Sequence, residues 1–344
     1  MNAIHQRVSV IAPCRNERDH LAAFCQSVAD QQLPDGVALE VLIADGISDD
    51  GTRDLLQSIC AGDGRFKMVD NPGRIVSCGL NRCLAQANGE VIVRMDLHTE
   101  YAPDYIAQCL AALRQSQADN VGGPWRARAA NDRPTQQAVA AAFQSRWLAG
   151  GARSRQLDHS GWVDTVYLGC WPRRVFERFG GFDETLVRNQ DDEHNLRITL
   201  GGGRIWQSKD IISSYQPRAS ISALFRQYLQ YGYWKPFVMR KHGRPASIRH
   251  LLPGLLLLAL LGLALAALAG ASAAPLWALA GVYALAVAVA TTMIAAHSRW
   301  QLWPRLPLVI VAYHAAYGLG SLLGWFDVLR GAKSGRHRFA RLTR

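Results

Sequence analysis

Short apolar runs, each followed by a polar turn, recur along the first part of the chain. Runs rich in Val, Ile and Leu predict buried strands at residues 7–12, 39–44, 66–69 and 91–95. Between them, apolar residues return every three or four positions, which is typical of the buried face of a helix. Strands that alternate with helices predict βαβ units, and we therefore expect an α/β fold with a mostly parallel sheet.

The same alternation continues less regularly further along. It predicts helices at about residues 105–115 and 136–147 and strands at 164–169 and 204–207. The first 239 residues are accordingly expected to form one folded domain.

Three long apolar runs follow, at residues 251–270, 275–296 and 306–326. Each has about the 20 residues without charge that are needed to cross a bilayer. The third run is interrupted by His314 and several glycines. We expect a membrane region at 250–326 that ends in a basic tail, residues 327–344.

The formal net charge of +11 belongs entirely to this second part of the chain. Residues 240–344 contain twelve Lys and Arg against the single acid Asp327, whereas residues 1–239 carry equal numbers of both signs. A nucleic-acid-binding protein would carry its excess charge on the folded domain. The expected partner is therefore the anionic cytoplasmic leaflet of a membrane, with no nucleic acid.

The basic residues also predict an orientation. Those before the first run and between the second and third place these links in the cytoplasm, and the uncharged link 271–274 outside. A third crossing would put the basic tail outside, against this bias. The third run is thus expected either to cross in spite of its charges or to lie re-entrant or interfacial, with the tail inside.

Polar side chains with binding chemistry follow three of the predicted strands. Arg15 and Glu17 follow the first, Asp45 ends the second, and Asp96 and His98 follow the fourth. Ligands of open α/β sheets bind at the carboxyl ends of the strands, where these residues would meet. Asp96 and His98 stand two apart, so on a strand they would share one face and could hold a divalent cation. The alternative is a strand followed by a polar turn that Asp96 caps.

Two further segments have both a structural and a functional interpretation. Three acids, Asp191, Asp192 and Glu193, open a predicted helix, where the helix dipole favours them; one of them could instead serve as a general base. Residues 218–245 predict an interfacial helix on which Gln230 and Trp234 share a face. That face suits a sugar ring or a membrane surface, and both can hold at once.

Several motifs resemble those of inverting glycosyltransferases of family 2, which have the GT-A fold. Residues 13–17, PCRNE, resemble the family's P-x-x-N-E, and residues 45–52, DGISDDGT, resemble its D-D-G-S-x-D-G-T with Gly46 in place of the second Asp. Residues 96–98, DLH, stand where the family has its metal-binding D-x-D. Residues 190–192, QDD, stand where it has E-D, and no dinucleotide or P-loop fingerprint occurs.

The resemblance implies roles for individual residues. It implies that Asp45 holds the nucleotide base, that Pro13, Arg15, Glu17, Arg74 and Asp96 contribute to donor binding, and that Asp96 and His98 bind Mg²⁺ or Mn²⁺. It makes Asp191 the catalytic base, with Asp192 as the competing assignment, and puts Gln230 and Trp234 on the acceptor side with Asp192. The family's Q-x-x-R-W is present only as residues 230–234, QYGYW, which favours a single-addition enzyme.

The resemblance also implies a reaction and a location. It implies inverting transfer of a sugar from a UDP-sugar, UDP-glucose being the expected donor, to a hydroxyl of a polyprenyl-diphosphate-linked saccharide in exopolysaccharide synthesis. The enzyme would be a multi-pass protein of the bacterial inner membrane with a cytoplasmic catalytic domain. The alternatives are a polyprenyl-phosphate sugar synthase and a membrane-anchored binding or scaffold protein without activity.

Overall fold

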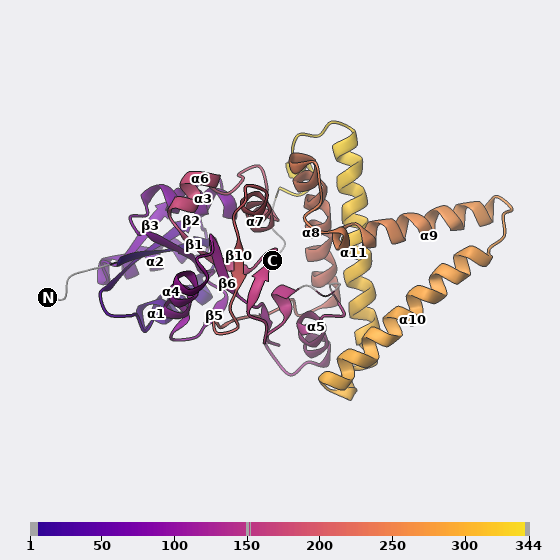
Figure 1. The fold of residues 1–344 in the computed structure, drawn as a ribbon, viewed down its shortest axis with the longest axis horizontal. Coiled ribbons are helices and arrows are strands. Elements are labelled where there is room, and N and C mark those ends of the chain that lie inside the picture. Colours follow the sequence, from indigo (N-terminus) through magenta and orange to yellow (C-terminus); the bar gives the residue numbers. More distant parts are fainter. Residues whose placement is uncertain (1–5, 149–150, 152, 341–344) are drawn as a thin grey trace. The chain divides into compact units, whose positions relative to one another are not determined.

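The computed structural model describes residues 6–148, 151 and 153–340 (Figure 1). The chain divides into two compact units, and each combines two segments of the sequence. The first, here the sheet unit, contains Met1–Arg126 and Arg153–Tyr215. The second, here the helical unit, contains Ala127–Ala152 and Gln216–Arg344.

The sheet unit is built on an eight-stranded sheet in the order β3-β2-β1-β4-β9-β6-β10-β8, within the described residues. Its strands are β1 Gln6–Cys14, β2 Val37–Asp45, β3 Phe66–Asp70, β4 Val91–Arg94, β6 Asn120–Gly123, β8 Gly161–Val163, β9 Tyr167–Pro172 and β10 Ile205–Gln207. A three-stranded sheet in the order β5-β11-β7 consists of β5 Thr99–Tyr101, β11 Ser213–Tyr215 and β7 Arg126–Ala127.

The four strands predicted first pair in parallel, β3 with β2, β2 with β1 and β1 with β4. This confirms the expected α/β fold with a mostly parallel sheet. β9 is inserted antiparallel between β4 and β6. The predicted strand at 164–169 is misplaced, because the buried residues Cys170 and Trp171 carry the pairing with β4.

Helices cover both faces of the large sheet. They are α1 Arg18–Ala29, α2 Thr52–Gly62, α3 Val76–Gln86, α4 Tyr105–Ser116, α6 Arg174–Phe179 and α7 Gln190–Leu200. Successive residues of β1 enter different cores: Val10 packs with Leu21 of α1, whereas Ile11 packs with Leu80 of α3. A strand buried on both faces needs apolar residues at every position, which explains the continuous apolar runs of the sequence.

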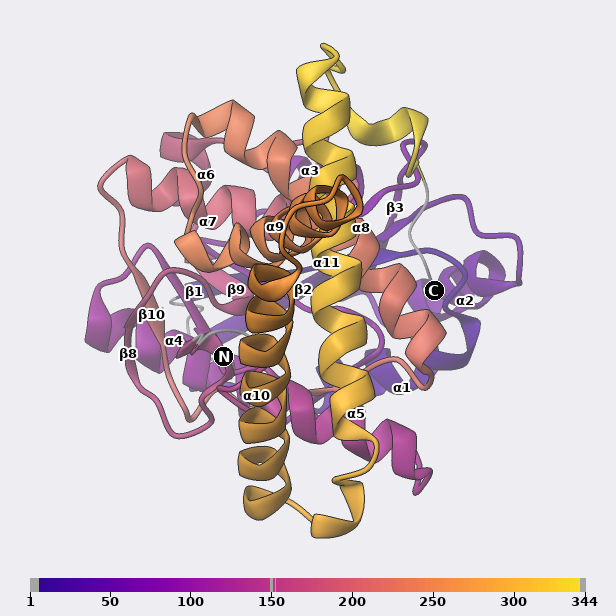
Figure 2. The ribbon, with the colours of Figure 1, turned by 90° about the vertical axis from the view of Figure 1, so that its right-hand side faces the viewer.

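In the residues that the structure describes, the helical unit consists mainly of five helices. They are α5 Pro134–Gln144, α8 Ile221–His242, α9 Leu252–Leu268, α10 Ala274–His297 and α11 Leu306–Leu329. Figure 2 shows α8 and α11 side by side. Phe143 of α5, Tyr228 of α8 and Tyr313 of α11 meet in its core. By length and composition alone, α10 and α11 could each cross a membrane, and α9 is a shorter apolar helix.

Candidate active site

The carboxyl ends of the first strands lie level with one another. In the register of the sheet, Cys14 at the end of β1 is opposite Asp45 at the end of β2, and Asp45 is opposite Asp70 at the end of β3. The Met95 amide, just after β4, donates to the Ile11 carbonyl of β1. The sheet therefore brings the loops after β1, β2 and β4 to one rim, as the sequence predicted.

The loops after β1 and β2 are hydrogen-bonded to each other. The Asn16 side chain exchanges two bonds with Asp49, at 2.7 and 3.0 Å, and the Asn16 amide donates to Ser48 Oγ at 2.8 Å. The Glu17 amide donates to Thr52 Oγ1 at 2.9 Å. The polar residues of PCRNE and DGISDDGT thus fix the backbone of each other's loop.

Gly46 makes room for the side chain of Arg15. A Cβ atom at position 46 would lie 3.1 Å from Arg15 Cβ and 3.2 Å from its Cδ. The Gly46 amide also donates to the Cys14 carbonyl at 2.8 Å, which fixes the two loops together. In this chain the stem of an arginine thus occupies the space beside the position where the family motif has its second aspartate.

Asp45 is completely buried and already has partners within the protein. Both of its carboxylate oxygens lie 3.3 Å from the Ser48 amide, and Oδ2 accepts from Arg53 Nη1 at 3.0 Å. The same guanidinium reaches Asp70 at 2.7 Å. Arg53 was not among the predicted site residues, although it follows the DGISDDGT motif directly.

Asp96 lies in a turn, not on a strand. β4 ends at Arg94, and the Thr99 amide donates to the Asp96 carbonyl at 3.2 Å to close the turn. The Tyr101 hydroxyl completes it, because it accepts from the Asp96 amide at 2.6 Å and donates to the Asp96 carbonyl at 3.0 Å. The expectation that Asp96 and His98 share one face of a strand is therefore wrong, since the strand ends two residues earlier.

Arg94 holds the Asp96 carboxylate at two points. Its Nε and Nη2 atoms lie 3.0 Å from Oδ1 and Oδ2, and the guanidinium is buried. Nη1 has no hydrogen-bond partner among the described residues. Burial alone would lower the pKa of Arg94, but the negative charges of Asp96 and then Asp191 raise it. Arg94 was missed, although a lone arginine at the end of an apolar run is a visible signal.

His98 is exposed at the same rim. Its Nδ1 atom lies 3.9 Å from Glu17 Oε1, so the structure brings together the ends of β1 and β4. The His98 ring meets the edge of Tyr215, with centroids 6.2 Å apart. Tyr215 in turn packs on Trp125 and Tyr167, and Tyr167 stacks on Trp125. This aromatic cluster, which was not predicted, packs against the His98 ring through Tyr215.

The donor atoms at the rim fit a cation that takes most of its ligands from a substrate. In the part of the chain that the structure describes, no three His, Cys, Asp or Glu side chains are placed to hold a metal by themselves. Asp96 and His98 offer one carboxylate and one imidazole. Mg²⁺ in nucleotide enzymes is commonly held by one or two carboxylates together with phosphate oxygens, so this donor set suits a metal–diphosphate complex.

Asp191 stands at the start of α7. Asn189 precedes the helix with a left-handed φ of 63°, and Asp191 Oδ1 accepts from the Asp192 amide at 3.0 Å. Burial and then the negative charge of Asp192 raise the pKa of the Asp191 carboxyl, and Arg94 opposes them. A carboxylate that is more basic than usual and close to a fixed cation suits a general base.

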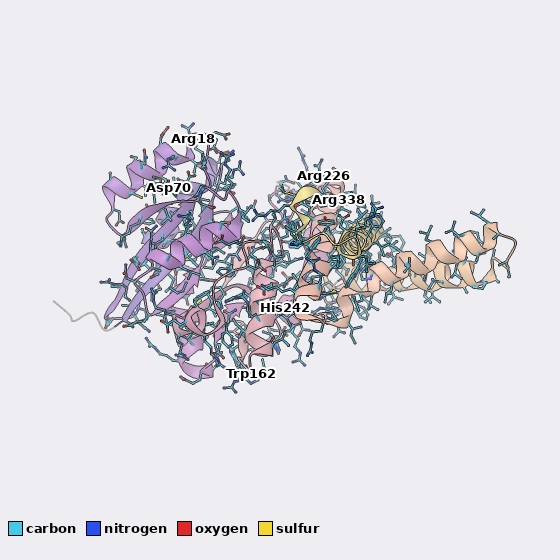
Figure 3. The ribbon with its side chains drawn as sticks, turned by 90° about the horizontal axis from the view of Figure 1, so that it is seen from above. Arg18, Asp70, Trp162, Arg226, His242 and Arg338 are labelled. Carbon is cyan, nitrogen blue, oxygen red and sulfur yellow. The ribbon has the colours of Figure 1, made fainter. Side chains whose placement is uncertain are left out.

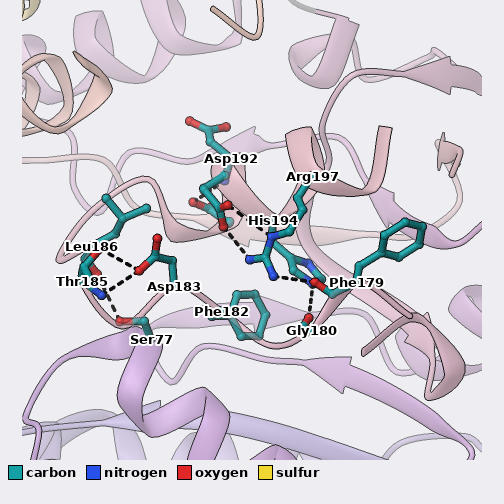
Figure 4. A network of polar contacts seen from close by, with 12 residues as sticks. Ser77, Phe179, Gly180, Phe182, Asp183, Thr185, Leu186, Asp192, His194 and Arg197 are labelled. Carbon is teal, nitrogen blue, oxygen red and sulfur yellow. Dashed lines mark hydrogen bonds and ion pairs between the residues drawn. The ribbon is translucent and has the colours of Figure 1, made fainter. Parts of the chain in front are cut away.

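Several anchors fix the start of α7 (Figure 4). Glu193 is buried and pairs with Arg197 at 2.6 Å, and Arg197 also donates to the Phe179 carbonyl. His194 Nε2 lies 3.1 Å from the Gly180 carbonyl oxygen, and its ring stacks on Phe176. Burial and the nearby Arg197 lower the pKa of His194 to about 4, so the ring is neutral at pH 7. The third acid of the QDDE segment therefore has a structural role.

The remaining predicted residues lie in different surroundings. Pro13 is half-buried in β1, and Arg74 is exposed after β3 with a φ of 58°. Gln230 and Trp234 belong to α8 of the helical unit and are buried there. The Trp234 indole packs against Tyr233 and Phe237. Their acceptor-side role stays a prediction.

Comparison with known proteins identifies the family to which the residues of this rim belong. The model of the family "Glycosyl transferase family 2" matches residues 9–177. The succinoglycan biosynthesis protein ExoA of Rhizobium meliloti (strain 1021) is 30% identical over 246 residues, which cover 71% of this chain and 73% of that protein. The chain belongs to glycosyl transferase family 2. The matched segment contains the loops after β1, β2 and β4, so the recognition based on PCRNE and DGISDDGT is confirmed.

Two further proteins resemble this family 2 glycosyltransferase over most of its length. A Methanococcus voltae enzyme, dolichyl N-acetyl-alpha-D-glucosaminyl phosphate 3-beta-D-2,3-diacetamido-2,3-dideoxy-beta-D-glucuronosyltransferase, is 23% identical over 92% of the chain and 96% of its own length. The structure of the mannosyltransferase PcManGT from Pyrobaculum calidifontis, in complex with GDP-Man and Mn²⁺, has a TM-score of 0.61 at 21% identity and covers 95% of this chain and 90% of its own. The expected GT-A fold is confirmed.

Proposed function

We propose that this glycosyltransferase transfers glucose from UDP-glucose, with inversion, to a hydroxyl of a polyprenyl-diphosphate-linked saccharide in exopolysaccharide synthesis. The observations that carry the proposal are the two-point pairing of Arg94 with Asp96 and the raised pKa of Asp191 at the start of α7. Arg94 and Asp96 would supply charged groups on the donor side, and Asp191 would supply the base on the acceptor side.

The donor would bind along the loops after β1, β2 and β3. Asp45 would accept from the nucleotide base, with its orientation fixed by Arg53. The guanidinium of Arg15, whose stem crosses Gly46, and the exposed Arg74 would neutralise phosphate charge. Pro13 and Glu17 would shape the floor of this site.

Asp96 and His98 would hold Mg²⁺ or Mn²⁺ together with the diphosphate. When bound, such an ion neutralises charge on the departing diphosphate. The two-point pair with Arg94 uses one lone pair on each Asp96 oxygen, so further lone pairs remain for a cation. The PcManGT complex contains Mn²⁺ with GDP-Man, which supports a cation at a nucleotide sugar.

Asp191 would remove the proton of the acceptor hydroxyl. The hydroxyl oxygen forms its bond to the anomeric carbon while the bond from that carbon to the diphosphate oxygen breaks on the opposite face. The proton stays on an Asp191 oxygen, and UDP leaves with the bonding electrons. One displacement inverts the configuration, so an α-linked donor gives a β-linked product. Asp192, at the next position, would tune this base or contact the acceptor.

The relatives support a lipid-linked acceptor and a membrane location. The Rhizobium protein is named for succinoglycan biosynthesis, and the Methanococcus enzyme for transfer to a sugar on a dolichyl phosphate. The helices α10 and α11 are long and apolar enough to cross a bilayer. We therefore place the enzyme in the bacterial inner membrane, with the sheet unit in the cytoplasm and the basic residues of 240–344 facing its anionic leaflet.

The test is a transfer assay with full-length protein and radiolabelled UDP-glucose. Polyprenyl-diphosphate-linked saccharides and polyprenyl phosphate are supplied separately, with Mn²⁺ present. We expect organic-soluble label only with the saccharide acceptors, and none with Asp191→Asn. Label on polyprenyl phosphate alone would instead make the protein a polyprenyl-phosphate sugar synthase. Neither transfer nor UDP release with any UDP-sugar would leave only a binding or scaffold role.

A further inference from the structure

The helices α9 and α10 expose apolar side chains around most of their surface. Residues 252–297 contain no Asp, Glu, Lys or Arg. Figure 3 shows side chains of this hairpin standing clear of the rest of the helical unit. The exposed fractions reach half or more at Leu255 56%, Leu258 54%, Leu261 55%, Leu265 57%, Trp277 72%, Val282 67% and Leu285 66%. A surface of this extent needs an apolar environment.

The charges and tryptophans around the hairpin indicate which environment covers it. Arg249 precedes α9, and Arg299 and Arg305 follow α10, whereas the link at 269–273 carries no charge. Trp300 and Trp303 are exposed at the base of the hairpin, and Trp277 is exposed near its tip. Basic residues on one side, none on the other, and tryptophans near both ends are typical of segments that cross a bilayer.

The helix lengths agree with this environment. The 17 residues of α9 span about 25 Å and the 24 residues of α10 about 36 Å. Because the helices share the link at 269–273, α10 must be tilted to cover the same depth as α9. In Figure 1 both helices leave α11 and meet at their far ends. Nearer the base, α10 buries Val287, Ile294 and Ala295 in the core of the helical unit, and partway along it Tyr283 Oη lies 3.2 Å from His314 Nδ1 of α11.

The helix α11 differs from this pair although it is equally long. In its most apolar 18 residues 56% are buried, against 28% in α10. α8 runs parallel to it: Tyr228 packs on Tyr313, and a Cβ atom at Gly232 or Gly324 would collide with the backbone of the other helix. The two backbones are therefore in close contact along their length.

A polar partner helix argues against a bilayer around α11. α8 carries the exposed Arg226 and Arg240, and its polar Gln227, Gln230 and Lys235 are buried in the protein. Placing these residues in hydrocarbon would be costly, and α8 cannot stay outside while α11 crosses. The apolar residues that α11 still exposes recur at helical spacing, as on one side of an interfacial helix: Leu308, Val311, Leu319 and Phe326.

The carboxyl-terminal tail is fastened to the same pair of helices. Asp327, at the end of α11, is buried; it accepts from the Tyr233 hydroxyl of α8 at 2.7 Å and pairs with Arg338 of the tail at 3.0 Å. Arg240 of α8 donates to the backbone carbonyls of Ala332 and Lys333. The single acid of residues 240–344 thus holds the tail beside α8.

We propose that α9 and α10 insert into the bilayer as a two-helix hairpin, while α11 lies along the membrane surface and does not cross it. The sheet unit, α8 and the tail are then all on one side of the membrane. The inference rests on the proposed membrane location, and it decides between the two possibilities that the sequence left open for residues 306–326. It assigns the exposed side of α11 to the lipid surface.

The topology can be read by cysteine labelling of the full-length protein in intact bacterial cells. Ala271→Cys marks the tip of the hairpin, and Ala340→Cys marks the tail. With an impermeant maleimide and peptide mapping, we expect position 271 to be labelled in spheroplasts, and position 340 only after permeabilisation. Cys60, a partly exposed native cysteine of the sheet unit, serves as the internal marker. Labelling of position 340 from outside would overturn the proposal, as would protection of position 271.

A second pair of variants tests α11 itself. Leu261→Lys puts a charge in the middle of α9, and Leu319→Lys puts the same charge on the exposed side of α11. We expect the first to reduce retention in carbonate-washed membranes several-fold and the second to leave it unchanged, because a lysine at the surface can reach water. Equal losses would show that α11 crosses the bilayer. Since neither experiment measures sugar transfer, its outcome is independent of the proposed reaction.

Discussion

Arg94 and Asp96 form an ion pair at the end of β4, with Nε–Oδ1 and Nη2–Oδ2 distances of 3.0 Å each. The guanidinium is buried and also interacts with Asp191. It therefore links the residue expected at the donor with the residue expected at the acceptor. A divalent cation at Asp96 would add to a positive charge that the protein already contains.

Replacing Arg94 should lower the transfer rate by more than any loss of folded protein would account for. In Arg94→Met, Asp96 is no longer fixed and Asp191 loses the cation beside it. We expect kcat/KM to fall about 10²-fold, because a small displacement of a binding group costs a factor of that size. Steady-state transfer rates measure it, and Mn²⁺ titration of donor binding should show weaker binding.

The matched control is Arg65→Met. Arg65 pairs with Asp63 at 2.6 Å at the start of β3, away from the rim. We expect a small change in melting temperature and no change in kcat/KM. Equal activity of the two variants would remove Arg94 from the site.

The two neighbouring acids of α7 should behave differently. Asp191→Asn should lower kcat by roughly 10²–10⁴-fold, the usual contribution of a general base, with little change in donor affinity. Asp192→Asn should retain most of the activity. If the two results are exchanged, the base is Asp192.

The pH profile gives a finer test of the same pair. A base acts only when deprotonated, so activity should fall as the pH drops through the pKa of Asp191, which burial and Asp192 raise above the ordinary value of 3.8. Asp192→Asn removes a nearby negative charge and should lower the pKa of Asp191. The acid limb of kcat against pH should therefore move to lower pH in this variant, and an unmoved limb would contradict the coupling.

Arg15 and Gly46 should be coupled in donor binding. In Gly46→Ala the new methyl group would press on the stem of Arg15, at about the 3.1 Å that an ideal Cβ gives. We expect weaker donor binding in Gly46→Ala. Adding Arg15→Ala to this variant should weaken donor binding less than Arg15→Ala does in the wild-type protein, because it also relieves the crowding. Calorimetric titration of the four proteins in the cycle measures the coupling. Strictly additive losses would mean that Arg15 does not use this space.

A stability prediction concerns the opposite end of the strands. Burial alone would raise the pKa of Glu40, but bonds from Ser9, Asn88 and Lys67 lower it to about 2. This contribution to stability is present above the unfolded pKa of about 4.5 and is lost as the pH falls towards 2. We expect Glu40→Gln to cost about 1–3 kcal/mol at pH 7 and less at pH 3.

Thermal melting of full-length protein in detergent across this pH range measures the effect. Glu177→Gln, at an exposed position of α6, is the control and should change little. A Glu40→Gln deficit that stays constant down to pH 3 would show that the charge of Glu40 is not what stabilises the sheet.

The parts of this protein that the sequence predicted are those with a periodic or motif signal. The strands β1, β2 and β4 contain continuous apolar runs because both faces of the sheet are covered there, and Asp45 follows from its place at the end of such a run. The family membership followed from the motifs that begin at Pro13 and Asp45.

Other features depend on contacts between distant segments, which no local pattern encodes. The turn at Asp96 requires a hydrogen bond to the Tyr101 hydroxyl. The pairing of Arg94 with Asp96 requires the guanidinium to be buried next to that carboxylate. β5, β8 and β11 have three residues each, too few for a periodic signal. The cover of α11 by α8 depends on Gly232 and Gly324, which in the sequence look like interruptions of apolar helices.

In the proposed reaction, Asp191 acts as the base for a single displacement at the anomeric carbon. Proton NMR of the first product tests this mechanism. The donor is the α-linked UDP-sugar that best stabilises the protein against heat in the presence of Mn²⁺, and the acceptor is water or the lipid-linked saccharide. We expect a β-configured product from wild-type protein and none from Asp191→Asn. An α-configured first product would contradict it.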